Sequence, residues 1–330
     1  MTPAIPGDQI DDYRLDSLIA RGGMASVYRA TDLRNGATVA IKIPHPEAEC
    51  DPASYERFQR EEQLGRLMDH PGIVREISEG KKSRVYMALE WVEGRLLGEV
   101  MSKEGTLPPQ RAVRIAVEIC EALEHIHSHG VVHRDLKPEN IIVDSCDRIK
   151  LIDFGIASRR GARRLTFGKF ARLTGTADYI APEQIKGKRG DVRTDIYAMG
   201  VLLFEMLTGT VPFEGENLLA VMNLRTHQDA PPVREANAAI SRELEAIVGR
   251  ALAREPEDRY RSARDLAWDL EHPDQVQSIE PALPAPRWSA RLRVARGWRT
   301  RVSRQALLYA ALAMIPMLLF GLMLFVARVA

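Results

Sequence analysis

The segment HRDLKPEN, residues 133–140, indicates the fold of this chain most clearly, because it combines groups that an ordinary turn does not need. It lies between the apolar pieces VV and IIV and carries an aspartate, a lysine and an asparagine at offsets of zero, two and five residues. In phosphoryl transfer, Asp135 would orient the substrate hydroxyl, Lys137 would neutralise the transferring group, and Asn140 would bind magnesium. The spacing therefore predicts a catalytic loop.

A second metal ligand follows this loop. The triplet DFG begins at Asp153, thirteen residues after Asn140. Oxygen ligands suit a hard divalent cation, and a site with few protein ligands leaves positions for water and phosphate oxygens. Asn140 and Asp153 are therefore the expected ligands of Mg²⁺.

The stretch ARGGMASVY, residues 20–28, leaves two interpretations open when it is read by itself. In the frame G-x-G-x-x-G of a phosphate-binding loop, the three glycine positions are occupied by Ala20, Gly22 and Ala25. Glycine suits these positions because any Cβ can hold the backbone N–H groups away from the phosphates. The stretch is either a nucleotide-binding loop that lacks two glycines or a surface turn between two strands.

Lys42 ends an alternating strand, VAIK, shortly after this loop. A lysine at such a position is more often a solvated surface residue. A glutamate on the following helix could pair with it, and Glu61 lies at the expected place. Glu62 points about 100° away around a helix, so only one of the two carboxylates should face Lys42.

The chain changes its periodicity near residues 90–94. Residues 13–91 are mostly strand-like, with one helix expected at 53–68, whereas residues from 94 onward show helical spacing, as in the apolar stripe between 109 and 129. Past His272 the sequence becomes proline-rich, which is typical of a linker. The expected fold class is α+β, with a small β-rich lobe followed by a larger helical lobe.

Three further motifs complete the pattern: GTADYIAPEQ (175–184), RTDIYAMGVLLFEMLTG (193–209) and EPEDRYRSARDL (255–266). In order and spacing, these motifs over residues 13–272 resemble bacterial Hanks-type serine/threonine protein kinases. The lysine of HRDLKPEN and the GT pair before APE are typical of the serine/threonine class. The resemblance implies a two-lobed kinase domain at 11–272, with the N-lobe at about 11–93 and the C-lobe at about 94–272. It implies transfer of the ATP γ-phosphoryl group to protein Ser/Thr hydroxyls.

The resemblance also assigns site residues. Lys42, Glu61, Asp135 and Lys137 would be catalytic, and residues 20–28 would be the glycine-rich loop. The expected ATP contacts are Ala20, Arg21, Gly22, Gly23, Met24, Ala25, Val27, Ala40, Lys42, Leu89, Glu90 and Val92. Leu89 would be the gatekeeper, and residues 90–92 would form the hinge that meets adenine. Ala20 and Ala25 should stiffen the loop and raise the KM for ATP without abolishing activity.

Four residues are expected to support the C-lobe and its regulation. By the resemblance, Glu183 should form a buried ion pair with Arg259, and Asp195 should hold the backbone of the catalytic loop. Arg134 implies a cationic pocket that a phosphorylated activation loop would neutralise.

Within the activation segment, Thr176 should contact Asp135 and Lys137. Thr166 and Thr174 are the expected phosphorylation sites, with Ser158 as a further candidate. The arginines between residues 158 and 176 fit a solvated basic loop as well as a preference for acidic substrates.

Two other function classes fit the sequence less well than an active protein kinase. A pseudokinase scaffold would bind nucleotide at the membrane without catalysis, but Lys42, Asp135, Asn140 and Asp153 are all present, which favours an active enzyme. A small-molecule phosphotransferase is a poorer fit, because the segment GTADYIAPE is built to seat a polypeptide. By analogy with similar bacterial kinases, a homodimer through the small lobes is a further expectation.

Charge and hydropathy place the chain at a membrane. Eight arginines follow the last acidic residue, Glu280, so the preceding 280 residues carry a formal charge of about −7, which argues against nucleic-acid binding. Residues 306–327 contain no charged side chain and are long enough to cross a bilayer. We expect a proline-rich and then basic juxtamembrane linker at 273–304 and a transmembrane helix at 305–327. A buried core helix and a nucleic-acid patch are the alternatives. The arginines and the three separated cysteines favour a cytoplasmic kinase domain at the inner membrane.

Overall fold

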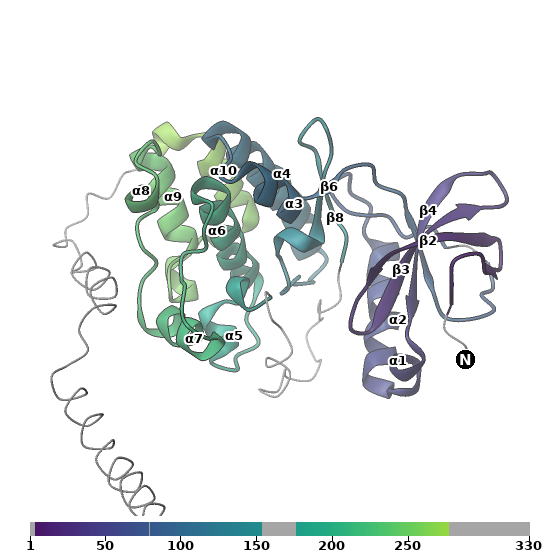
Figure 1. The fold of residues 1–330 in the computed structure, drawn as a ribbon. Helices are drawn as coiled ribbons and strands as arrows, with labels where there is room; N and C mark the ends of the chain where they lie inside the picture. The colour runs from purple at the N-terminus through teal and green to yellow at the C-terminus, as the bar shows by residue number, and fades with distance from the viewer. Residues whose placement is uncertain (1–3, 79, 154–175, 277–330) are drawn as a thin grey trace, which may run out of the picture. The chain divides into compact units, whose positions relative to one another are not determined.

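Two antiparallel sheets and a group of helices make up residues 4–78, 80–153 and 176–276, which are those that the computed structural model describes (Figure 1). All of them lie in the first of two units into which the chain divides, Met1–Ser278 and Ile279–Ala330. The strands are β1 (Gln9–Ile10), β2 (Tyr13–Arg21), β3 (Ala25–Asp32), β4 (Thr38–Pro44), β5 (Met87–Glu90), β6 (Arg95–Leu96), β7 (Ile141–Val143) and β8 (Ile149–Leu151). The α-helices are α1 (Pro46–Cys50), α2 (Pro52–Leu67), α3 (Leu97–Glu104), α4 (Pro109–Ser128), α5 (Pro182–Ile185), α6 (Val192–Thr208), α7 (Leu218–His227), α8 (Val233–Ala236), α9 (Arg242–Ala251) and α10 (Ala263–Glu271). Short 3-10 helices are η1 (Pro138–Asn140), η3 (Thr176–Tyr179), η4 (Pro256–Asp258) and η5 (Pro273–Gln275).

The N-lobe is built on a five-stranded sheet in the order β1-β2-β3-β4-β5. Every neighbouring pair is antiparallel, and the register pairs Lys42 on β4 with Val27 on β3 and with Met87 on β5. Residues alternate between buried and more exposed along β3 and β4, as a half-buried sheet requires. This register fixes the position of Lys42 on an inner strand, between β3 and β5.

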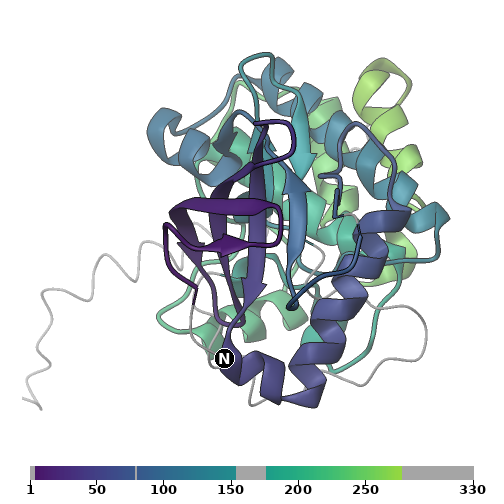
Figure 2. The same ribbon diagram turned by 90° about the vertical axis from the view of Figure 1, so that its right-hand side faces the viewer.

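Helix α2 crosses beside this sheet, as Figure 2 shows. It begins after Asp51, whose side chain accepts a hydrogen bond from the backbone N–H of Ser54 at 3.0 Å, and Pro52 occupies its first position. Its Phe58 packs with Ala25 and Met87 of the sheet. The helix expected at 53–68 is therefore found, as α2.

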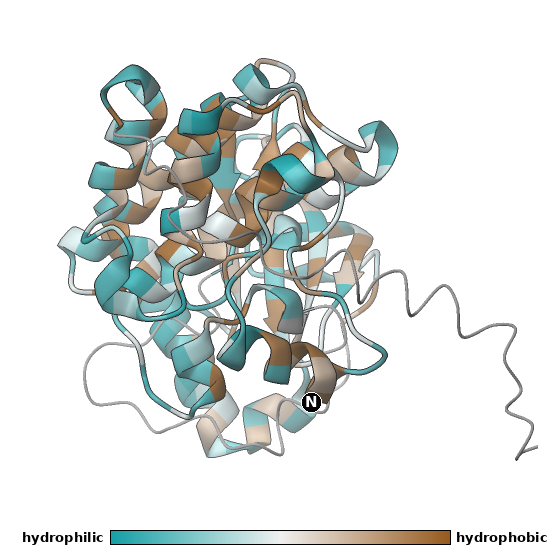
Figure 3. Cartoon of the chain, turned by 90° about the vertical axis from the view of Figure 1, so that its left-hand side faces the viewer, coloured by the Kyte–Doolittle hydropathy of each residue, from teal (hydrophilic) through white to brown (hydrophobic). Residues whose placement is uncertain are grey.

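The C-lobe surrounds the central helix α6, which is buried on nearly all sides. The apolar stripe expected on α4 is buried at 0% exposure, from Ala112 to Ile126. At Gly200 on α6, an added Cβ would lie 3.0 Å from the Cβ of Ala251, so this glycine lets α6 and α9 approach closely. Brown apolar and teal polar segments alternate along the helices of this lobe in Figure 3, as amphipathic helices require.

The two-lobed α+β fold is thus confirmed for the described residues. None of the helices described there is both long and apolar enough to cross a bilayer. The transmembrane helix expected at 305–327 and the linker residues from 277 onward lie outside the described residues.

Candidate active site

Three charged side chains from separate elements meet beside the sheet. The Lys42 ammonium on β4 donates to Glu61 Oε1 on α2 and lies 3.2 Å from Oδ1 of Asp153, just after β8. The side chains of Lys42 and Glu61 are 13% and 9% exposed, whereas that of Asp153 is 37% exposed. Glu62 points elsewhere and pairs with Arg66 and Lys82. The structure therefore shows the predicted pairing of Lys42 with Glu61, and it adds a contact between Lys42 and Asp153 that was not predicted.

The protonation of these groups follows from their burial and their charges. Burial opposes the charged form of Lys42, but the carboxylates of Asp153 and Glu61 raise its pKa above the ordinary value. Burial, and after it the nearby Asp153, raises the pKa of Glu61, while Lys42 counteracts this effect. A cation close to Asp153 would offset the repulsion between the carboxylates of Glu61 and Asp153. It would therefore favour the ionised form of Glu61 beside the Lys42 ammonium.

The catalytic loop brings its three polar residues into contact. Lys137 Nζ lies 3.0 Å from Asp135 Oδ2, and Nδ2 of Asn140 donates to the Asp135 carbonyl at 2.8 Å and to Oδ2 at 3.2 Å. The short helix η1 ends the loop at Asn140. The backbone N–H of Ile152 donates to the Asn140 carbonyl at 3.1 Å, which brings Asp153 next to Asn140.

Asp195 holds this loop from below, on α6. Its carboxylate accepts from the backbone N–H of His133 at 2.8 Å and of Arg134 at 2.7 Å, and from His127 Nε2 at 2.8 Å. Burial opposes ionisation, but the hydrogen bond from His127 and the charges and backbone N–H groups around it lower the pKa of Asp195. Arg134 has a left-handed φ of 65°, a conformation that costs energy in a non-glycine residue and that these bonds fix. His127 was not predicted from the sequence.

A buried ion pair links the start of α5 to the segment before α10 in the C-lobe. Nη1 and Nη2 of Arg259 each lie 2.9 Å from a carboxylate oxygen of Glu183, and the Arg259 side chain is 0% exposed. Thr194 Oγ1 also donates to Glu183, at 2.8 Å. The predicted pair between Glu183 and Arg259 is therefore present, and its geometry is bidentate.

Residues 13–269 match the family described as the protein kinase domain. The chain belongs to the protein kinase family. The serine/threonine-protein kinase PknB of Mycobacterium leprae is 37% identical to it over 265 residues, which cover 79% of this chain and 42% of that protein. The probable serine/threonine-protein kinase PknB of Corynebacterium glutamicum is 37% identical over 269 residues, with the same shares of 79% and 42%. The chain thus matches less than half the length of these curated relatives.

A solved structure supports the same assignment. The crystal structure of the Mycobacterium tuberculosis PknI kinase domain, a C20A mutant, superposes with a TM-score of 0.63 at 25% identity, and the match covers 83% of this chain and 100% of that one. These relatives confirm the resemblance to bacterial Hanks-type kinases.

In this kinase domain, the segment at residues 20–28 forms the turn between β2 and β3. Gly22 donates its N–H to the Ala25 carbonyl at 2.9 Å, and the register pairs Ala20 with Val27. A Cβ at Gly22 would lie 3.3 Å from the Ala25 carbonyl oxygen, tighter than ordinary contact. The stretch is thus a hairpin between β2 and β3, and its role as a nucleotide-binding loop stays a prediction.

The expected adenine contacts come from adjacent strands. Ala40 on β4 pairs with Leu89 on β5, and Glu90 ends β5 before Val92. Arg21, Gly23 and Met24 lie in or beside the exposed hairpin turn. The structure therefore places the expected adenine contacts on the neighbouring strands β4 and β5 and the expected phosphate contacts at the turn between β2 and β3.

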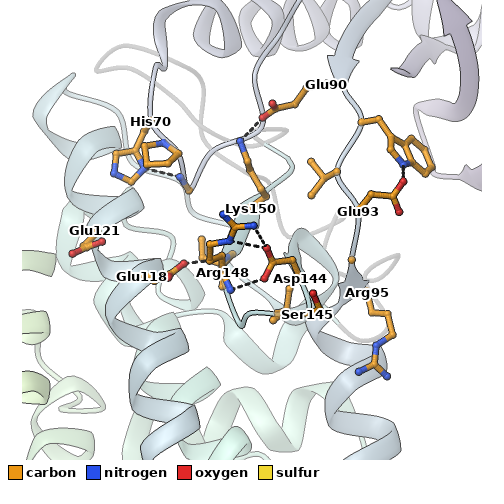
Figure 4. A pocket seen from close by; sticks show the side chains of 17 residues that line it. His70, Glu90, Glu93, Arg95, Glu118, Glu121, Asp144, Ser145, Arg148 and Lys150 are labelled. Carbon is orange, nitrogen blue, oxygen red and sulfur yellow. Dashed lines mark hydrogen bonds and ion pairs between the residues drawn. The ribbon is translucent and has the colours of Figure 1, made fainter. Parts of the chain in front are cut away.

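The hinge has a polar anchor that no motif signalled. Lys150 Nζ on β8 forms an ion pair with the Glu90 carboxylate, which also accepts from the backbone N–H of Arg75 at 3.0 Å. A Cβ at Gly94 would lie 2.6 Å from the Val143 carbonyl oxygen, so the chain after the hinge passes directly over β7. Figure 4 shows the Glu90–Lys150 pair at a cavity of about 850 Å³.

That cavity is distinct from the cluster around Lys42 and Asp135. Among the predicted site residues that the structure describes, Glu90 and Val92 line it. Other lining groups include Glu118, whose carboxylate accepts from the backbone N–H of Ile149 at 2.9 Å, and Asp144, which pairs with Arg148 (Figure 4). Two ion pairs, Glu90–Lys150 and Asp144–Arg148, join charged groups that line the cavity.

The activation segment is described only at its two ends. Thr166 and Thr174 lie outside the described residues, and Thr176 begins η3. Burial, followed by the charge of Arg189, lowers the pKa of Arg134, which is consistent with the expected cationic pocket. Within the described ranges there is no group of three or more His, Cys, Asp or Glu that could hold a metal by itself. Asn140 and Asp153 still fit a magnesium site that phosphate oxygens and water would complete.

Proposed function

We propose that this chain is an ATP-dependent serine/threonine protein kinase. The observation that carries the proposal is the convergence of two groups: the ion cluster of Lys42, Glu61 and Asp153, and the hydrogen-bonded loop of Asp135, Lys137 and Asn140. If the ion cluster only stabilised the fold, the carboxylate of Asp153 would not need to be partly exposed and next to the polar residues of the catalytic loop. The family match and the PknB relatives support the same activity.

Each residue has one role in this proposal. Asp135 would accept the hydrogen bond of the substrate hydroxyl and aim its oxygen, and Lys137 would stabilise the charge of the transferring phosphoryl group. Lys42, held by Glu61, would bind the phosphates of ATP. Asn140 and Asp153 would hold Mg²⁺, which would supply electrostatic stabilisation of the phosphate oxygens.

The N-lobe would supply the rest of the nucleotide site. Residues 20–25 would cover the phosphates, Val27 and Ala40 would pack on adenine, and the backbone of residues 90–92 would meet its edge. Ala20 and Ala25 carry Cβ atoms where glycine would allow closer approach, so restoring glycine at both positions should lower the KM for ATP. An unchanged KM would refute this view of the loop.

Transfer from γ-labelled ATP to a generic Ser/Thr substrate protein tests the proposal. The full chain should transfer label to Ser or Thr with Mg²⁺, lose transfer when the metal is chelated, and lose it in Asp153→Asn. A control, Arg148→Met, removes an exposed surface cation and should retain full transfer. ATP binding without any transfer would instead support the pseudokinase scaffold.

Regulation and assembly are proposed in the same way. Autophosphorylation at Thr174 or Thr166 would place a phosphate near Arg134, and active protein without phosphate on this segment would contradict it. Polypeptides bearing Ser or Thr are the proposed substrates, with Thr176 at the site where they bind. A homodimer through the small lobes remains a prediction, tested by the molar mass of the chain in solution.

The membrane anchor is proposed from the sequence. Residues 305–327 would span the inner membrane, with the arginines of residues 287–304 on the cytoplasmic side beside the kinase domain. Fractionation tests this. Release of the full-length chain by high salt or carbonate, or a chain truncated after Pro286 that still sediments with membranes, would contradict it.

A further inference from the structure

Helix α2 is tied to the N-lobe on the side away from the ion cluster as well. Glu62, the neighbour of Glu61, accepts from Lys82 Nζ at 2.6 Å and from Arg66 at 2.7 Å. Arg66 also donates to Oε2 of Glu76 at 3.0 Å, and Lys82 lies 3.7 Å from Oε1 of Glu76. Two carboxylates and two cations therefore form one network, which we call the rear clamp: Glu62, Arg66, Glu76 and Lys82.

The rear clamp is largely shielded from solvent. The side chains of Lys82, Glu62 and Glu76 are 14%, 18% and 1% exposed, whereas that of Arg66, the outermost member, is 50% exposed. Exposed ion pairs contribute little, because solvent screens them and their side chains lose entropy, but pairs that are partly buried are screened less. A Cβ at Gly65 would lie 3.2 Å from the Cβ of Glu76, so α2 also packs closely at this point.

Lys82 is itself fixed to the sheet side of the lobe. Its Nζ donates to the Tyr86 carbonyl at 2.7 Å and lies 4.8 Å from the centre of the Tyr86 ring. Tyr86 is 2% exposed and its hydroxyl donates to Asp11 at 3.0 Å. Lys82 therefore connects α2 to a buried residue directly before β5.

Consecutive residues of a helix point about 100° apart around its axis. The ion pair of Glu61 with Lys42 and the packing of Phe58 hold α2 on the side that faces the sheet. A second contact from Glu62, in another direction and to another part of the lobe, fixes the rotation of the helix. We propose that Lys82 and Glu62 are positioning residues that hold α2 in the rotation that directs Glu61 at Lys42. This inference rests on the role proposed above for Lys42 and Glu61.

A matched control exists on the same helix. Arg60 pairs with Glu56 one turn away at 2.7 Å, within α2 alone, so this pair ties the helix to nothing else. Arg60→Met removes an ion pair from α2 but leaves the rear clamp intact. Its phosphate transfer should equal that of the wild type.

Steady-state transfer of labelled phosphate by the full chain tests the inference. Lys82→Met and Glu62→Gln should each lower kcat/KM by about tenfold. The double variant should lose little more than either single one, because both variants disrupt the same ion pair between Lys82 and Glu62. Lys82→Arg keeps the charge and should lose less than Lys82→Met. Equal loss in Lys82→Arg and Lys82→Met, or additive losses in the double variant, would overturn the proposal.

The decisive comparison uses a Glu61→Gln background, with long incubations so that residual transfer is measured. If Lys82 acts through Glu61, Lys82→Met should cause less than about a twofold further loss there. A general loss of folded protein would instead lower transfer by the same factor in both backgrounds, and that result would refute positioning. Full activity of Lys82→Met in the wild-type background would refute it too.

Two further variants separate this inference from the proposed function. Lys42→Met and Glu61→Gln should each impair transfer strongly. If they do not, the roles assigned to the ion cluster are wrong, and the proposal for Lys82 and Glu62 is wrong with them. If they do and Lys82→Met stays fully active, the positioning role alone is wrong.

Discussion

Arg259→Met removes one partner of a deeply buried ion pair in the C-lobe. The guanidinium makes both bonds to Glu183 and donates to the carbonyls of Ala253, Arg193 and Arg254 at 2.7–2.9 Å. Its centre also lies 4.8 Å from the ring of Tyr197. Methionine fills part of the volume but makes none of these contacts.

The expected cost follows from what remains behind. Glu183 is 5% exposed and would keep Thr194 as a hydrogen-bond donor, which does not compensate a full charge. Breaking a buried pair from one side costs about 3–5 kcal/mol of unfolding free energy, because the other charge stays buried. At roughly 2–4 °C per kcal/mol for a domain of this size, the unfolding temperature should fall by roughly 10 °C.

Chemical and thermal unfolding of the full chain measure this effect. The control is Arg264→Met, since Arg264 is 79% exposed and lies 3.7 Å from Glu124, so its loss should cost about 0–1 kcal/mol. Replacing both Glu183 and Arg259 by methionine should cost less than the sum of the single variants, because no lone charge is left. A loss under about 1 kcal/mol in Arg259→Met, or strict additivity, would refute the reasoning.

Three further predictions concern pH and backbone packing. The pKa of Asp195 is lowered below the ordinary 3.8, so its carboxylate stabilises the fold above about pH 4. The difference in unfolding free energy between the wild type and Asp195→Asn should therefore narrow as the pH falls through the lowered pKa. A difference that stays constant in acid would contradict this. Burial, followed by His129, lowers the pKa of His125 from 6.5, so its neutral form is favoured in the folded state and its contribution is lost as the pH falls below about 6.5. His125→Phe should therefore flatten the decline of the unfolding temperature between about pH 7 and 5, and an unchanged decline would argue against it. Gly94→Val should destabilise the chain and lower ATP affinity, because the valine Cβ would collide with the Val143 carbonyl oxygen. Normal ATP binding together with normal stability would show that this close approach is not required.

The sequence predicted those site contacts that arise from short spacings. Asp135, Lys137 and Asn140 belong to one loop, so their proximity follows from the chain itself. Helix geometry predicted that only one of Glu61 and Glu62 would face Lys42, since residues one apart point about 100° away from each other. The buried pair of Glu183 and Arg259 spans 76 residues and was available only through the family resemblance.

The supporting contacts were not predictable, because they join segments that no motif connects. His127 reaches Asp195 across 68 residues, and Lys150 reaches Glu90 across 60. Lys82 looks like any surface lysine in the sequence, yet tertiary packing buries it beside Glu62. Partners of this kind depend on how elements pack, whereas local patterns report only which elements form.

The rate of phosphoryl transfer by Asp135→Asn, measured together with ATP affinity, tests most directly whether this cluster of residues catalyses the reaction. Asparagine preserves the shape of the side chain but cannot accept the hydroxyl proton, so transfer to a Ser/Thr substrate should fall by about 10²–10⁴-fold. ATP affinity should stay within about twofold of the wild type, because Asp135 acts on the substrate hydroxyl in the transition state and not on the nucleotide. A variant that transfers phosphate at the wild-type rate, or that loses ATP binding in parallel with transfer, would contradict the assigned role of Asp135.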